Sequence, residues 1–156
     1  MAKVLIVAEH DGSALNPSTA KCVACAAHID GATIDIAVFA ADAGAIASEA
    51  AAVDGVNAVL AVEVAAHANP VAAILAPQLV ELAEAYDYVF GPSTTFGKDL
   101  MPRVAALLGV NQVSDIMSVD GPRNFKRPIY AGNAIVSVTV PGDVKVVATV
   151  RIASYQ

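Results

Sequence analysis

The chain contains 156 residues, of which 56% are hydrophobic and 5% aromatic, and its formal net charge at pH 7 is −6. This length predicts a single domain over residues 1–156, because domains usually contain about 100–200 residues. The acidic charge argues against a nucleic-acid-binding protein, since nucleic acids are bound by basic surfaces.

The hydropathy of the chain raises the question of a membrane span. Mean hydropathy is +0.60, but the longest stretch without a formal charge, residues 64–80, contains His67, Pro70 and Pro77. A helix that spans a bilayer needs about 20 predominantly apolar residues, so no membrane insertion is predicted. The first residues show no signal-peptide pattern, and the sequence predicts a soluble, cytoplasmic domain.

The first strand and the first helix are marked by clear boundary residues. Residues 4–8 form a continuous apolar run, which is typical of a strand buried on both faces. Asn16 is suited to cap the following helix and Pro17 to occupy its first position, because the N–H that proline lacks would have no partner there. Gly31 is expected to end this helix. The predicted small-residue face of the helix consists of Ala20, Val23, Ala24 and Ala27.

The alternation of strands and helices continues as far as Gly109. The predicted elements are, in chain order, a strand over residues 34–39, a helix over 43–53, a strand over 58–62, a helix over 69–86, a strand over 87–90 and a helix over 98–108. Pro77 must either kink its helix or begin the main body of that helix at Gln78, and Pro102 is tolerable only near a first turn. Strands that alternate with helices at this spacing indicate a parallel sheet.

The last third of the chain has a different character. Val113, Ile116 and Val119 and the runs 135–140 and 144–152 are typical of β-strands, and short turns rich in Gly and Pro separate them. We therefore predict an α/β, Rossmann-like fold, with a mostly parallel sheet flanked by helices. A C-terminal β-hairpin or meander is added to this sheet or continues it.

Cys22 and Cys25 form a Cys-x-x-Cys pair inside the first helix. In a redox motif the first cysteine lies at a helix N-terminus, where the helix dipole lowers its pKa, and this pair lies beyond that position. A zinc site with His28 is conceivable but lacks a fourth ligand. Buried helix cysteines are the favoured interpretation, and no metal site is predicted.

The strongest local signal is the loop over residues 91–99, which follows a strand and opens a helix. Thr94, Thr95, Gly97 and Lys98 lie where free helix N–H groups bind anions. Alternatively a Ser or Thr of this loop simply caps the helix, and the glycine spacing matches no phosphate-binding fingerprint. No hydrolase, dinucleotide-binding or Walker motif occurs, so no catalytic residue is predicted.

The basic residues are concentrated in the second part of the chain. Residues 1–90 carry two basic and eleven acidic residues, whereas residues 91–156 carry seven and four. The most basic segment leads into Arg127, Tyr130 and Asn133, which combine a charge, an aromatic ring and an adaptable amide as partner surfaces often do. A solvated turn with a packed tyrosine is the alternative.

Several motifs that occur in order along the chain carry a family resemblance. They are Ala8-Glu9-His10-Asp11-Gly12, Leu15-Asn16-Pro17, residues 92–106, Ser114-Asp115 and residues 127–134. The most specific are the segments 94–103 and 127–134. Together they resemble the N-terminal domain of the electron transfer flavoprotein alpha subunit, over essentially the whole chain.

The resemblance implies a part of an electron carrier rather than an enzyme. Proteins of this family are heterodimers of alpha and beta subunits that carry electrons on FAD from dehydrogenases to a quinone reductase or a similar acceptor. Their alpha N-terminal domain packs against the beta subunit, and a second alpha domain holds most FAD contacts. The resemblance thus implies that the FAD domain is absent here and that no FAD is bound by this chain alone.

The resemblance also bears on the two candidate sites. In the family the beta subunit binds AMP at a loop similar to residues 92–99, whereas the alpha domain is not expected to do so. This favours the capping role for Thr94 and its neighbours, and a structural or interface role for residues 127–133. Two alternatives remain, namely a stand-alone adenine-nucleotide-binding regulatory domain resembling universal stress proteins and a purely structural dimerisation module.

Overall fold

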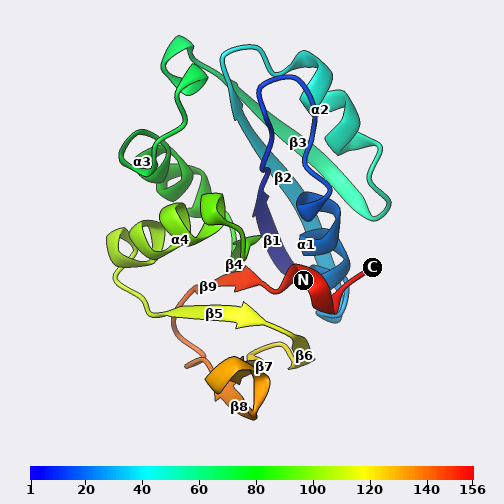
Figure 1. Ribbon diagram of the computed structural model, residues 1–156, viewed down its shortest axis with the longest axis vertical. Helices are drawn as coiled ribbons and strands as arrows, with labels where there is room; N and C mark the ends of the chain where they lie inside the picture. The colour runs from blue at the N-terminus through cyan, green and yellow to red at the C-terminus, as the bar shows by residue number, and fades with distance from the viewer.

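The structure, a computed structural model that describes residues 1–156, contains the predicted alternation of strands and helices (Figure 1). The strands of the main sheet are β1 (Ala2–Val7), β2 (Ala32–Ala40), β3 (Val56–Glu63), β4 (Tyr88–Pro92), β5 (Gln112–Ile116) and β9 (Val146–Val150). The α-helices are α1 (Ser18–Ala26), α2 (Gly44–Ala51), α3 (Ala72–Ala83) and α4 (Thr95–Leu107). None of the helices is long and apolar enough to cross a membrane.

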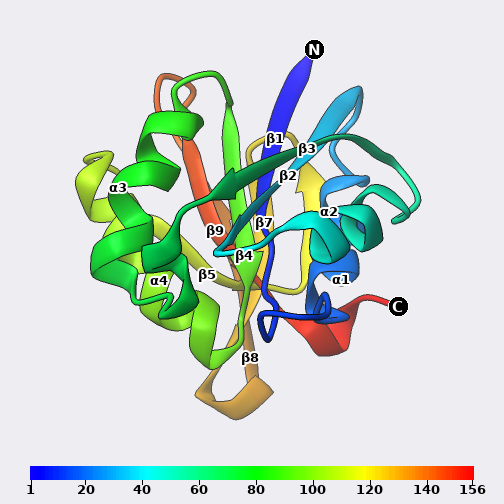
Figure 2. The same ribbon diagram turned by 90° about the horizontal axis from the view of Figure 1, so that it is seen from above.

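All neighbouring strands of the main sheet are parallel, in the order β3-β2-β1-β4-β9-β5. Helices α1 and α2 cover one face of this sheet, and α3 and α4 cover the other, as Figure 2 shows. The predicted α/β fold with a parallel sheet flanked by helices is confirmed. Because both faces are covered, the central strands read as continuous apolar runs.

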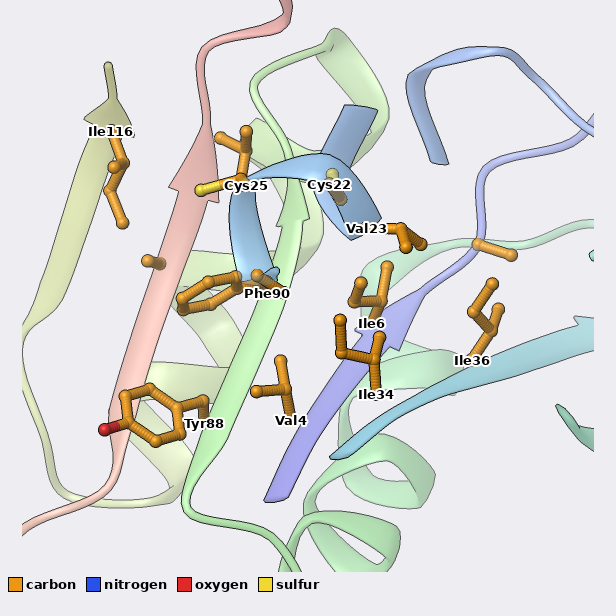
Figure 3. Close-up of a cluster of buried hydrophobic side chains, with 14 of the residues drawn as sticks. Val4, Ile6, Cys22, Val23, Cys25, Ile34, Ile36, Tyr88, Phe90 and Ile116 are labelled. Carbon is orange, nitrogen blue, oxygen red and sulfur yellow. The ribbon is translucent and has the colours of Figure 1, made fainter. Parts of the chain in front are cut away.

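Strand β1 contributes side chains to the hydrophobic clusters on both faces of the sheet. Its side chains alternate between the faces of the sheet, so Val4 and Ile6 join the cluster under α1, whereas Leu5 and Val7 join the cluster under α3 and α4. Figure 3 shows Val4 and Ile6 beneath α1, together with Phe90 of β4. Each fully buried aliphatic side chain contributes about 2 kcal/mol, which makes β1 a central element of the fold.

Helix α1 begins as predicted but buries a different face. Asn16 Oδ1 accepts a hydrogen bond from the N–H of Ser18 at 2.9 Å, which confirms the cap. Half of the predicted small-residue face is wrong: Ala20 and Ala27 are exposed, whereas Val23 is buried and Ala24 packs partly against the core. Besides Val23, the buried residues of α1 are Ser18, Thr19, Cys22, Cys25 and Ala26.

Both helix prolines lie inside helices. Pro77 lies within α3, and the helix continues through it. Pro102 lies within α4, which begins at Thr95 rather than Lys98, so the prediction that Pro102 falls near a first turn is wrong. Both rings are exposed. The carbonyl groups that lose their intrahelical partner belong to exposed residues, Ala73 and Lys98, and water can bond to them.

The last third of the chain contributes to two sheets. The strands β6 (Ser118–Gly121), β7 (Asn124–Ile129) and β8 (Ala134–Thr139) form the predicted antiparallel meander. The chain then returns to the main sheet, where β9 lies between β4 and β5. Short 3-10 turns complete the structure, namely η1 (Ala65–Ala68), η2 (Tyr130–Gly132) and η3 (Ile152–Ser154).

Candidate functional site

The order of the strands reverses between β1 and β4, and we call the carboxyl ends of these two neighbouring strands the switch point. From β1 the chain proceeds outward to β2 and β3, and then returns to the opposite side of β1 to form β4. Ligands of open α/β sheets bind outside such a point. The predicted loop over residues 91–99 follows β4 and therefore lies there.

Thr94 caps α4 at the switch point. Its Oγ1 accepts a hydrogen bond from the N–H of Gly97 at 3.3 Å, and its own backbone is extended. This confirms the prediction that a Ser or Thr of the loop caps the helix. Gly97 itself is required by packing, since a Cβ atom there would lie 1.7 Å from the carbonyl oxygen of Pro92. The close approach of helix α4 to strand β4 leaves no room for any side chain.

The carboxylate of Glu9 joins the two helices that begin at the switch point. Its Oε2 accepts hydrogen bonds from the hydroxyls of Ser18, the first residue of α1, and of Thr94, each at 2.9 Å. The backbone of Glu9 is held as well, because its N–H donates to Thr19 Oγ1 at 3.2 Å and its carbonyl accepts from the N–H of Asn16. Sequence reasoning noted Glu9 only as part of the motif over residues 8–12 and gave it no role.

The other residues of the predicted anion site do not converge on a common position. Thr95 and Lys98 are exposed, and no ion pair involves Lys98, since the structure contains only the pair of Lys126 with Asp120. The hydroxyl of Ser93 is buried without a hydrogen-bond partner. Of the four residues, only Thr94 and Gly97 are brought together, through the cap.

His10 and His67 each make their own hydrogen bonds within the fold. His10 Nε2 lies 2.7 Å from the carbonyl oxygen of Phe39, and its Nδ1 accepts from the N–H of Gly12 at 3.0 Å. His67 is buried between the carbonyl oxygen of Val62 and the side chain of Gln78. No three His, Cys, Asp or Glu side chains lie close enough together to hold a metal ion.

The two cysteines are free thiols packed against the sheet. Cys22 and Cys25 are both fully buried (Figure 3), which confirms the interpretation as buried helix cysteines. Burial disfavours the charged thiolate. It raises the pKa of Cys25 to about 12 and raises that of Cys22 well above its ordinary value.

We expect both thiols to react slowly with a thiol reagent in the native state. At pH 8 a thiol with a pKa near 12 is ionised in about one molecule in ten thousand, and burial also blocks access. Labelling is followed by the absorbance of the released reagent. Ala20→Cys, on the exposed side of the same helix, serves as the fast-reacting control. Rapid labelling of Cys22 and Cys25 before unfolding would contradict their assignment to the core.

The second candidate region, which we call the Tyr130 turn, comprises residues 127–133 between β7 and β8. Tyr130 is 78% exposed. Its carbonyl oxygen accepts from the side-chain amide of Asn133 at 2.8 Å. Arg127 lies at the base of the turn, where its Nε donates to the carbonyl oxygen of Ser114 at 2.7 Å and so fastens β7 to β5. The three predicted interface residues thus lie around one turn.

The backbone of the Tyr130 turn is strained beside a surface cavity. Three residues other than glycine have a positive φ, namely Asp115 at 61°, Tyr130 at 49° and Ala131 at 53°. All three line one open cavity of about 430 Å³, together with Arg151. Strained backbone of this kind clusters at functional sites. Sequence reasoning did not single out Arg151, and it noted Asp115 only as part of the Ser114-Asp115 motif.

Apolar surface accompanies the strained turn. Ile135, which is 57% exposed, pairs with Pro128 across β7 and β8. Tyr130 and Ile135 are therefore two large exposed hydrophobic side chains at the same end of the meander. An exposed aromatic ring, a neighbouring aliphatic side chain and a nearby guanidinium group are typical of protein–protein contact surfaces. The arrangement suits binding rather than catalysis.

Comparisons with a family model and with individual known proteins all lead to the same protein family. Residues 4–156 match the family model described as electron transfer flavoprotein domain. The chain is 45% identical over 152 residues to the electron transfer flavoprotein subunit alpha of Pseudomonas aeruginosa, covering 97% of this chain and 48% of that protein. It is 42% identical to the subunit alpha of Paracoccus denitrificans, with 97% and 49% covered. It is 35% identical to the mitochondrial subunit alpha of Dictyostelium discoideum, with 97% and 44% covered. The chain spans about half the length of these relatives.

Proposed function

The chain belongs to the electron transfer flavoprotein family, and from this premise we propose that residues 1–156 form one N-terminal domain of an alpha subunit. In this proposal the domain is a scaffold and a subunit-interface part of an FAD-containing carrier. The carrier moves electrons from dehydrogenases to a quinone reductase or a similar acceptor. The domain itself performs no catalysis. The free, buried cysteines suit a reducing compartment, the cytoplasm.

The observation that carries the interface role is the Tyr130 turn. A tyrosine that is 78% exposed, on a left-handed backbone, gains nothing from packing within this chain. Tyrosine and arginine are enriched among residues that dominate binding energy at interfaces. We therefore propose that Arg127, Tyr130 and Asn133 contact the beta subunit of the heterodimer.

The switch point of this chain is poorly suited to the phosphates of FAD. The switch point, where a dinucleotide would place its phosphates, already holds the Glu9 carboxylate on the hydroxyls of Ser18 and Thr94. The cavity beside it measures about 10 Å³ and admits one water molecule at most. We propose that FAD is held elsewhere in the full complex and that this chain binds none when it is alone.

The pairing is tested by mixing the chain with an electron transfer flavoprotein beta subunit and measuring the mass by size-exclusion chromatography with light scattering. We expect a one-to-one complex. The same measurement on the chain alone gives the reference mass. A chain that forms only a dimer with itself and ignores the beta subunit would support the dimerisation module instead.

Absorbance spectra of the purified chain complete this test. After denaturation and desalting, we expect neither a flavin band nor an adenine band in the released small-molecule fraction. A stoichiometric flavin band would refute the proposal that FAD is held elsewhere. A stoichiometric adenine band would favour the alternative function, a regulatory domain that binds adenine nucleotides.

A further inference from the structure

Helices α1 and α4 both begin at the switch point, on opposite faces of the sheet. Figure 2 shows the two helices on either side of the strands. Each helix N-terminus carries partial positive charge from its aligned peptide dipoles. The position between the two N-termini therefore favours a negative group, which is the reason why folds of this kind bind phosphates there.

In this chain the negative group is a side chain. Glu9 follows β1, and its carboxylate lies 2.9 Å from the hydroxyl of Ser18 on α1 and 2.9 Å from the hydroxyl of Thr94 on α4. One oxygen atom, Oε2, accepts both hydrogen bonds. The Thr94 hydroxyl links this carboxylate to helix α4, because the same oxygen accepts a hydrogen bond from the N–H of Gly97 in the first turn of α4.

The cavity at the switch point is too small for a second anion. This cavity, of about 10 Å³, lies between the segments that follow β1 and β4 and is lined by Phe39, Phe96 and the imidazole of His10. That imidazole is occupied on both sides, by the carbonyl oxygen of Phe39 and the N–H of Gly12. A phosphate group would have to displace the carboxylate and would meet a charge of its own sign.

We propose that Glu9 is an internal anion that takes the place of a ligand phosphate at the switch point. It ties the N-termini of α1 and α4 together and excludes phosphate-bearing ligands from this end of the sheet. This role involves only residues of this chain and does not depend on the subunit pairing proposed above. It follows that a chain without the carboxylate presents an oxyanion site made of Ser18, Thr94 and the two helix N-termini.

The test compares the chain with its Glu9→Ala variant in potassium phosphate and in potassium chloride of equal ionic strength. We expect Glu9→Ala to lower the melting temperature by roughly 6–12 °C or more, because two charge-assisted hydrogen bonds are lost. Phosphate at about ten times its dissociation constant then restores about 3–6 °C, with a saturable dependence on concentration. The unsubstituted chain gains nothing from phosphate beyond the chloride control.

Two variants separate a specific site from general salt effects. Glu49→Ala removes another carboxylate, one that accepts from the N–H of Leu15 rather than from the hydroxyls of Ser18 and Thr94, and we expect no phosphate response from it. In the double variant Glu9→Ala with Thr94→Val the phosphate response is lost. If Glu9→Ala does not fold, Glu9→Ser is used in its place, since serine also removes the carboxylate.

Either of two results would overturn the proposal. One is a folded Glu9→Ala or Glu9→Ser variant that shows no saturable response to phosphate. The other is saturable binding of phosphate at the switch point of the unsubstituted chain, measured by isothermal titration calorimetry. The calorimetric measurement needs no substitution, so the proposal remains testable even where both variants are unstable.

Discussion

Gly97→Ala lowers the free energy of unfolding by about 3 kcal/mol or more, the upper end of what overpacking costs. A Cβ atom at this position would lie 1.7 Å from the carbonyl oxygen of Pro92 and 2.9 Å from its carbonyl carbon. Both are backbone atoms of β4, so no side-chain rotation relieves the clash and helix α4 must move. In a chain of this length the corresponding fall in melting temperature is roughly 6–12 °C.

Gly142→Ala is the matched control for this measurement. A Cβ atom at Gly142 would meet nothing within 4 Å, and φ there is not in the left-handed region. Such a substitution changes stability by less than about 1 kcal/mol, in the stabilising direction if at all. Thermal unfolding followed by circular dichroism compares the two. Equal melting temperatures for Gly97→Ala and the unsubstituted chain would show that α4 is not held against β4 as closely as described.

Tyr130→Ala weakens association with the beta subunit by about thirty-fold, the effect of losing an interface residue worth about 2 kcal/mol. The melting temperature of the chain itself changes by only about 1–2 °C, within the range of ordinary surface substitutions. The ring is 78% exposed and contributes little packing. Alanine also inherits the same left-handed backbone, so the strain of the turn is unchanged.

Arg127→Ala weakens association too, with a somewhat larger effect on stability. Its Nε donates to the carbonyl oxygen of Ser114, and the loss of one such bond costs about 1 kcal/mol, or roughly 2–4 °C. Val71→Ala removes another exposed hydrophobic side chain, far from the turn in the sequence, and leaves affinity unchanged. Affinities are measured by surface plasmon resonance with immobilised beta subunit. Unchanged affinity combined with a large loss of stability would show that the Tyr130 turn is core.

The elements that the sequence predicted well are those whose signals are local. The strand over residues 34–39 and the helix over 43–53 agree with β2 and α2 within a few residues. The caps at Asn16 and Thr94 were predictable because a cap involves only residues two or three positions apart.

Predictions that needed the packing partner were less accurate. The rotation of α1 about its axis buries Cys22 and exposes Ala20. This rotation depends on how the side chains of the helix pack against those of the sheet. The same holds for Pro102, since an exposed helix face accepts a proline that a buried face would not. The amino-acid pattern along one element does not reveal which of two similar faces the rest of the molecule covers.

The sequence by itself determined the fold class, the helix caps and the positions of Thr94 and Tyr130 at loops, because these follow from patterns a few residues long. Only the tertiary structure decided that β9 lies between β4 and β5, and that Glu9 meets Thr94 across 85 positions of sequence. Strand order depends on contacts between distant segments, and no local pattern encodes it. The carboxylate at the switch point is a consequence of that order, because only the neighbouring positions of β1 and β4 bring Glu9 and Thr94 together.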